Sequence, residues 1–278
     1  MTALHWSKRR IVTAVVAVAA AGSVSAGLLL SGNGGHDPAA GRPNRLASQT
    51  RRGTDRRPSP SSAGVTLLAA LRGGTPRYAS PDGAQVGSVP GEWYGTRSIL
   101  PVISRRPGWL RVRLAQRPDG STAWIRDGDD VQLLSTPYRI VVDLATTKLI
   151  LYSHDKELFS VPAGVGTTSD PTPTGHYFVA FFEAPPSPGY GAFVMVTSDH
   201  SDAISDWEGS GDAIIGIHGP LGGAALIGTD GAKISHGCIR LKNDALLRLR
   251  VVPAGTPIDV ISGSGTSAAG GAAAVRSS

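Results

Sequence analysis

Alternation of apolar and polar residues marks several short segments of this chain as β-strands. Residues 109–114 place leucine and valine on one face and arginine on the other, which is the period of a half-buried strand. An Arg-Pro-Asp-Gly turn at 117–120 and a second apolar segment at 122–126 complete a hairpin. Residues 64–135 are therefore expected to form a small β-domain.

A second strand-rich region covers residues 136–262. Residues 138–144 alternate, residues 145–148 form a turn, and residues 149–152 return as the next strand. Further strands are expected at Leu158–Val165, Tyr177–Phe182, Phe193–Thr197, Ala213–His218 and Pro257–Ile261. The fold class predicted from these patterns is all-β, with two β-domains in series.

One short helix interrupts this pattern. Asn243 is a suitable N-cap residue, and Leu246, Leu247 and Leu249 supply the apolar positions that follow it. The expected helix therefore begins just after Asn243.

The two ends of the chain differ in composition from its centre. Three basic residues, Lys8 to Arg10, precede an uncharged segment from Ile11 to Leu30, which is long enough to span a bilayer and also has the parts of a secretory signal. Residues 1–30 are expected to be a signal peptide or a membrane anchor, and the rest of the chain is expected to be exported. Residues 31–63 and 263–278 are rich in small and polar residues and are expected to be a disordered linker and tail.

The charge distribution argues against nucleic acid as a partner. The chain carries a net charge of +6, but residues 1–60 hold nine basic and two acidic residues, whereas the remainder holds 18 basic and 19 acidic ones. The basic character therefore belongs to the N-terminal region and not to the expected domains.

The chain has one cysteine, Cys238, which excludes an internal disulfide and a four-cysteine zinc site. In an exported chain a lone cysteine is either a buried small apolar residue or a nucleophile. Its neighbours favour the nucleophile. Gly237 permits tight backbone geometry whose N–H groups can point at an oxyanion, and His218, at the end of an apolar strand, is placed to act as a base.

These residues carry a resemblance to a known family. His218, sixteen intervening residues and then Ser235–Cys238 match the signature of L,D-transpeptidases with a YkuD-type catalytic domain, and Thr172–Gly175 resembles the Pro-Thr-Gly segment of that family. The resemblance covers residues 137–262 and implies a β-sandwich enzyme that acts on peptidoglycan stem peptides without a cofactor or metal. Residues 64–135 resemble bacterial SH3-like domains, as a spacer or as a wall-binding module.

The resemblance also implies roles for individual residues. Cys238 would be the nucleophile and His218 the general base, with its second nitrogen held by the carbonyl of Gly219. His236 would help to place the substrate. The remaining expected substrate and oxyanion residues are Ser235, Gly237 and Arg240; Arg240 would bind a substrate carboxylate, or else form an ion pair with Asp244 at a helical spacing.

The implied reaction is cysteine acyl transfer that forms 3→3 cross-links between stem peptides outside the cytoplasmic membrane. Several alternatives remain at this level. Water in place of the acceptor amine would give an L,D-carboxypeptidase, and the chain could instead bind the wall without catalysis. A papain-like peptidase places its cysteine before its histidine, opposite to this order, and a zinc site made from His218, His236 and Cys238 lacks a recognisable glutamate base.

Overall fold

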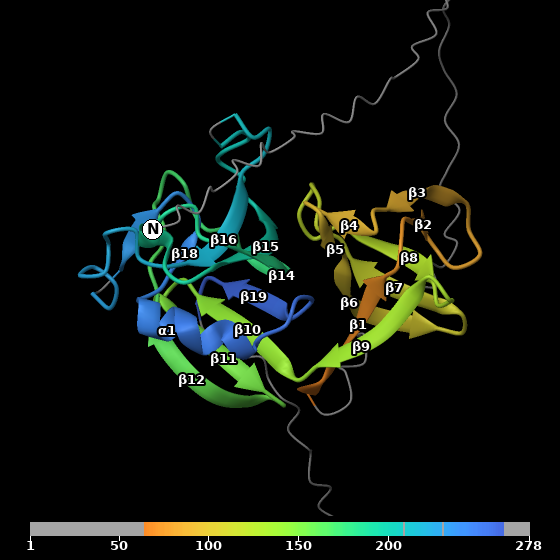
Figure 1. Ribbon diagram of the computed structural model, residues 1–278, viewed down its shortest axis with the longest axis horizontal. Helices are drawn as coiled ribbons and strands as arrows, with labels where there is room; N and C mark the ends of the chain where they lie inside the picture. The colour runs from red at the N-terminus through yellow and green to blue at the C-terminus, as the bar shows by residue number, and fades with distance from the viewer. Residues whose placement is uncertain (1–63, 208, 230, 264–278) are drawn as a thin grey trace, which may run out of the picture. The chain divides into compact units, whose positions relative to one another are not determined.

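The computed structural model describes residues 64–207, 209–229 and 231–263 (Figure 1). Strands dominate this part of the chain and one short α-helix accompanies them, so the all-β prediction is confirmed. The expected signal or anchor segment, the linker and residues 264–278 of the tail lie outside the described residues. In the described part, no helix is both long and apolar enough to cross a membrane.

Residues 66–136 form the first sheet, which has seven strands in the order β3-β2-β8-β7-β6-β1-β9. Its hairpin β7–β8 occupies the segments that alternate in the sequence, with Leu110 paired to Ile125 inside the core. A separate two-stranded ribbon, β4–β5, lies between β3 and β6 along the chain. The bounds are β1 Thr66–Leu71, β2 Thr75–Tyr78, β3 Gln85–Val89, β4 Glu92–Trp93, β5 Thr96–Arg97, β6 Ile99–Arg106, β7 Trp109–Arg113, β8 Thr122–Arg126 and β9 Val131–Thr136.

The second sheet has eight strands in the order β12-β11-β10-β19-β14-β15-β16-β18. Most neighbours are antiparallel, but β10 pairs with β19 and β16 pairs with β18 in parallel. The bounds are β10 Tyr138–Asp143, β11 Lys148–Ser153, β12 Lys156–Pro162, β14 Gly175–Glu183, β15 Val194–His200, β16 Ile214–His218, β18 Ile239–Arg240 and β19 Pro257–Ile261. A two-stranded parallel pair, β13 Val165–Gly166 and β17 Lys233–Ser235, lies outside this sheet.

Two details of the sequence prediction are wrong. The expected strand Leu158–Val165 is divided into β12 and β13, because Ala163 and Gly164 break the pairing with β11. Helix α1 spans Asn243–Arg248 with Lys242 as its N-cap, so Asn243 is the first helical residue and not the cap. Within and after the helix Leu246 and Leu249 are fully buried, whereas Leu247 is 44% exposed.

Strand β14 contributes side chains to two apolar cores, one on each of its faces. Tyr177 and Val179 belong to the core of the second sheet, whereas Phe178 and Ala180 belong to a core shared with the first sheet. Successive side chains of a strand point to opposite faces, which explains the division. The first sheet therefore packs its apolar residues against the outer face of β14 and β15.

A bulge in β14 extends the shared core. The pairing of β14 with β15 shifts register between Val179 and Phe181, and such a bulge places two residues opposite one. As a result Ala180 and Phe181 both contribute to the shared core. Trp93 of β4 packs against the ring of Phe181 at a centroid distance of 5.6 Å.

The shared core predicts that the two sheets depend on each other for stability. Phe178 is 1% exposed, so replacing it by alanine should lower the free energy of unfolding by about 3–5 kcal/mol. Phe182 in the same strand is 37% exposed, and Phe182→Ala should cost less than half as much. Urea unfolding followed by tryptophan fluorescence, which reports largely on the first sheet, should show the loss. A fluorescence transition that Phe178→Ala leaves unmoved would mean that the sheets unfold independently.

Candidate functional site

The end of β16 and the start of β18 place the two expected catalytic residues on neighbouring strands. His218 lies opposite Arg240 in the parallel pairing, and Cys238 directly precedes β18. The N–H of Gly216 donates to Sγ of Cys238 at 3.4 Å. A methyl group on Gly216 would lie 3.9 Å from Cδ2 of His218, so both functional side chains border on the same residue.

A tight turn between β17 and β18 presents the cysteine. The hydroxyl of Ser235 donates to the carbonyl of Cys238 at 2.5 Å and accepts from the N–H of Gly237 at 3.2 Å. The Ser235 side chain therefore joins the first residue of the turn to Gly237 and Cys238 at its end. Because the N–H of Gly237 is occupied in this way, its expected use as an oxyanion donor requires exchange of that hydrogen bond for one to the substrate.

Gly237 is needed at its position for two reasons. Its φ of +114° lies in a region that residues with a Cβ rarely adopt. A Cβ atom there would also lie 2.6 Å from Cδ1 of Ile215. The residue before the cysteine must therefore lack a side chain, as the sequence indicated.

Thr172 supports this turn from the other side. Its buried hydroxyl donates to the carbonyl of Gly237 at 2.6 Å and accepts from the N–H of Gly166 at 2.9 Å. In the sequence, the segment Thr172–Gly175 stands out only for its resemblance to the family, and no role for Thr172 follows from it. The structure shows that Thr172 joins β13 to the turn that carries Cys238.

The buried imidazole of His218 is fixed in one tautomer. Its Nδ1 lies 2.8 Å from the carbonyl oxygen of Gly219, and a carbonyl can only accept a hydrogen bond. Nδ1 therefore carries the proton and Nε2 keeps a free lone pair. Burial lowers the pKa of His218 to about 4, and the charge of Arg240 contributes in the same direction, so the ring is neutral at pH 7 and able to accept a proton.

Cys238 is a thiol and not a thiolate in the resting structure. It is partly exposed, but dense packing around the sulfur raises the pKa of the thiol. The hydrogen bond from Gly216 and the charge of Arg240 lower this pKa but do not offset the burial. Burial therefore favours the uncharged form of both the Cys238 thiol and the His218 imidazole.

Two aromatic side chains that the sequence analysis did not select border the histidines. The ring of Tyr190 packs on His218 with centroids 4.6 Å apart, and Trp207 packs on the exposed His236 at 5.3 Å. Tyr190 ends a three-residue 3-10 helix, Pro188–Tyr190, and Trp207 lies in a loop, so no hydrophobic period identifies either residue. In the described part of the chain, no three His, Cys, Asp or Glu side chains are grouped as metal ligands.

Arg240 lies beside His218 and keeps an open donor. Its Nε is buried and has no hydrogen-bond partner among the described residues. The alternative ion pair with Asp244 is absent from the ion pairs of the described residues, because Arg240 belongs to β18 and not to the helix. The Nε donor of Arg240 therefore has no partner within the described part of the chain.

Asp199 in β15 is a buried carboxyl group whose charge would act on Cys238. It is 1% exposed, and burial, together with the charges of Asp119 and Asp202, raises its pKa to about 9. Asp199 is therefore protonated at pH 7, and its charge would contribute to the raised pKa of Cys238 if it ionised. The sequence gave no sign of this group, because Asp119, which contributes to the shift, lies 80 positions away in the turn between β7 and β8.

Comparison with known proteins assigns the second β-domain. Residues 137–260 match the family model of the L,D-transpeptidase catalytic domain, YkuD. The putative L,D-transpeptidase YkuD of Bacillus licheniformis is 26% identical over 184 residues, which cover 66% of this chain and 97% of that protein. The Bacillus subtilis protein of the same name is 27% identical over 125 residues, covering 45% of this chain and 66% of that protein.

Solved structures of L,D-transpeptidases are also similar. The Enterococcus faecium L,D-transpeptidase is 22% identical with a TM-score of 0.37, and the match covers 54% of this chain and 55% of that one. The Mycobacterium smegmatis L,D-transpeptidase is 20% identical with a TM-score of 0.35, covering 55% and 91%.

The match to the family model thus places the second β-domain among the enzymes that modify peptidoglycan. Residues 137–260 belong to the YkuD family of L,D-transpeptidase catalytic domains. The resemblance of residues 64–135 to SH3-like domains stays a prediction.

The raised pKa of Asp199 predicts a dependence of stability on pH. Between about pH 4, the ordinary pKa of aspartate, and the value of about 9 in the folded protein, the folded state holds a proton that the unfolded state has lost. Stability should therefore fall as the pH rises through this window. Asp199→Asn keeps the shape of the neutral carboxyl group and removes this loss.

Thermal unfolding from pH 5 to pH 8 measures the effect. The Asn variant should lose less stability than the wild-type protein over this interval and should be the more stable of the two at pH 8. The exposed Asp129 offers a matched control, because Asp129→Asn should follow the wild-type curve. Parallel curves for the wild type and Asp199→Asn would show that Asp199 is ionised in the folded protein.

Proposed function

We propose that this protein is a peptidoglycan L,D-transpeptidase that forms 3→3 cross-links, with Cys238 as its nucleophile. The family assignment supports the reaction class. The observation that carries the proposal is the hydrogen bond between Nδ1 of His218 and the carbonyl of Gly219, because it leaves Nε2 as the base next to the only cysteine of the chain.

The first half-reaction forms a thioester. The Cys238 proton moves to Nε2 of His218 as Sγ attacks the carbonyl carbon at the L-centre of diaminopimelate in a tetrapeptide stem. The negative charge that develops on the carbonyl oxygen is stabilised by the N–H of Cys238, with that of Gly237 once it is released from Ser235. The carbon–nitrogen bond then breaks, and His218 returns the proton to the departing amine of D-alanine.

The second half-reaction transfers the acyl group. The side-chain amine of a second stem attacks the thioester carbon and gives a proton to His218. The carbon–sulfur bond breaks, and the proton returns from His218 to Sγ, which restores the neutral pair. A neutral imidazole is required at the start of each half-reaction, and the lowered pKa of His218 supplies it at pH 7.

The surrounding side chains are suited to hold the donor stem. Arg240 has a buried Nε without a partner among the described residues, and its planar guanidinium can bind a substrate carboxylate. Exposed His236, backed by Trp207, offers a polar edge beside the cysteine. Because peptidoglycan lies outside the cytoplasmic membrane, we place the catalytic domain there, held by residues 1–30 if that segment is not cleaved.

A product assay tests the proposed function. The purified protein is incubated with a disaccharide tetrapeptide, and the products are followed by mass spectrometry. A cross-linked dimer with release of D-alanine supports the transpeptidase. Free tripeptide alone would replace the proposal by a carboxypeptidase in which water resolves the thioester, and no product at all would leave only a wall-binding role.

Cys238→Ala should eliminate both turnover and covalent capture of a carbapenem, whose strained ring can acylate the thiol, while leaving the fold intact. The intact mass after incubation reports the capture, and the thermal unfolding midpoint reports the fold. A single adduct is expected on the wild-type protein only. An adduct that persists in Cys238→Ala would contradict the assignment of the nucleophile.

His218→Ala should lower kcat/KM by about 10²–10⁴-fold, which is the usual contribution of a general base, and should have a larger effect than His236→Ala. In the wild-type protein, kcat/KM should stay level from pH 8 to about pH 5. It should fall as the pH approaches the His218 pKa of about 4, because a protonated ring cannot accept the cysteine proton. Equal losses in the two variants, or a midpoint near pH 6.5, would show that His218 is not this base.

A further inference from the structure

We propose that the turn at residues 117–119, between β7 and β8, holds the loop that joins β15 to β16 over the catalytic cysteine; the described residues of this loop are 201–207 and 209–212. Arg117 and Asp119 are then positioning residues of the active site, although they belong to the other β-domain. This inference rests on the proposed function and concerns how its substrate site is kept in shape.

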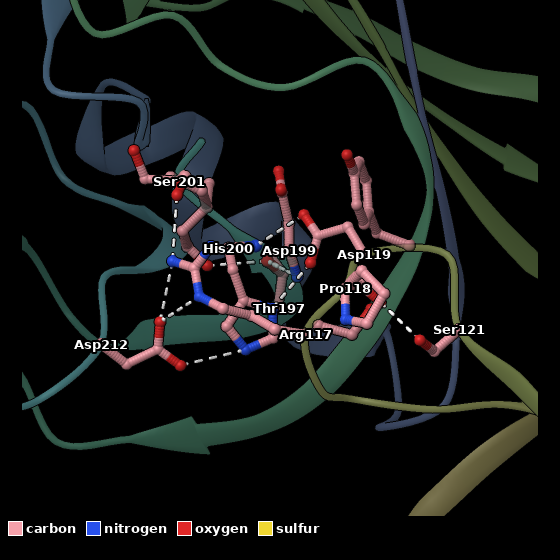
Figure 2. A network of polar contacts seen from close by, with 12 residues as sticks. Arg117, Pro118, Asp119, Ser121, Thr197, Asp199, His200, Ser201 and Asp212 are labelled. Atoms are coloured by element: carbon pink, nitrogen blue, oxygen red, sulfur yellow. Dashed lines mark hydrogen bonds and ion pairs between the residues drawn. The ribbon is translucent and has the colours of Figure 1, made fainter. Parts of the chain in front are cut away.

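Arg117 binds both ends of this loop (Figure 2). Its Nε donates to Oδ1 of Asp212 at 2.9 Å, and its Nη2 donates to the carbonyls of Ser201 at 2.9 Å and Ile204 at 3.3 Å. The loop leaves β15 after His200 and enters β16 at Ile214. One guanidinium therefore joins the beginning of the loop to its end, and the planar group supplies several donors in a fixed geometry.

Asp119 secures the same place through His200 (Figure 2). The carboxylate accepts from the backbone N–H of His200 at 3.0 Å and from its Nδ1 at 2.8 Å. Nε2 of the same ring lies 3.4 Å from Oδ2 of Asp212. His200 is 1% exposed, so this chain of contacts from Asp119 to Asp212 lies largely out of water, where polar contacts are strongest.

The electrostatics of the interface allow Asp119 to remain charged. Burial alone would raise the pKa of Asp119, but the hydrogen bonds from His200 lower it overall. The neighbouring Asp199 is the group that stays protonated, so two negative charges do not face each other. Trp93 adds an apolar contact, with its ring 6.1 Å from that of His200.

The loop connects this interface to the catalytic turn through Asp212. The side chain of Asp212 holds Arg117, and its carbonyl accepts from the backbone N–H of Trp207 at 3.0 Å. The ring of Trp207 packs on His236, two residues before Cys238. Three contacts thus connect Arg117 to the site. They are the ion pair with Asp212, the backbone hydrogen bond from Trp207 to Asp212 and the ring contact of Trp207 with His236.

The test compares Arg117→Ala with the wild-type full-length protein. Without the guanidinium the two ends of the loop lose three hydrogen bonds, so amide hydrogen exchange in residues 201–212 should become faster. Loss of charge-assisted hydrogen bonds of this kind should raise KM for the tetrapeptide donor by about tenfold. The change in kcat should be smaller, because Cys238 and His218 are not touched.

Three further variants make the result specific. Arg117→Lys supplies one point charge in place of the fork and should restore part of the KM and of the exchange protection. Asp212→Asn keeps the backbone carbonyl that accepts from Trp207. It should change KM and amide exchange in the same direction as Arg117→Ala but by less, and it replaces that variant in the test if Arg117→Ala unfolds. Arg105→Ala, which removes an arginine of the first sheet paired with Asp127 at 3.0 Å, should change neither quantity.

Two outcomes would overturn the inference. Unchanged exchange in residues 201–212 of Arg117→Ala would show that the arginine does not hold the loop. Faster exchange with unchanged KM would show that the loop does not serve the site. If the wild-type protein has no transpeptidase activity, the proposed function fails separately. The labelling rate of Cys238 by a bulky maleimide then tests whether the loop covers the cysteine. This rate should rise in Arg117→Ala, and an unchanged rate would contradict the inference.

Discussion

One hydrogen bond, from Nδ1 of His218 to the carbonyl of Gly219, determines the chemistry available at this site. It fixes the proton of His218 on Nδ1 and leaves Nε2 free to accept a proton. The neighbouring backbone holds the acceptor residue, Gly219, in place. The N–H of Gly219 donates to the carbonyl of Tyr190 at 2.7 Å, and a Cβ on Gly219 would lie 2.7 Å from the backbone of Gly191. The acceptor is thus a glycine because only a residue without a side chain fits against this loop.

Burial shifts the pKa values of His218 and Cys238, the proposed catalytic pair, in opposite directions. It lowers the pKa of His218 and raises that of Cys238, and both shifts favour the uncharged form. The site therefore differs from cysteine enzymes that rest as a thiolate beside an imidazolium. A resting thiol is less open to oxidation by adventitious agents, which would suit the proposed location of this domain outside the membrane.

The sequence predicted the features that depend on local pattern. The strands at 122–126 and 257–261 were placed at their observed bounds, because their apolar periods are clear. His218 and Cys238 were selected from residue type and spacing, and the structure places His218 at the end of β16 and Cys238 directly before the neighbouring β18. The contact between Arg117 and Asp212 spans 95 positions, and no local period records such a pairing. The two-residue strand β18 is likewise too short to show a period.

The alternation of β14 between two cores affects how this chain can be divided. A fragment that begins at residue 136 would uncover Phe178 and Phe181, whose neighbours in the shared core come largely from the first sheet. Contiguous apolar surface of this kind promotes self-association. The first sheet therefore acts as the cover of an apolar face of the catalytic domain, whether or not it also binds the wall.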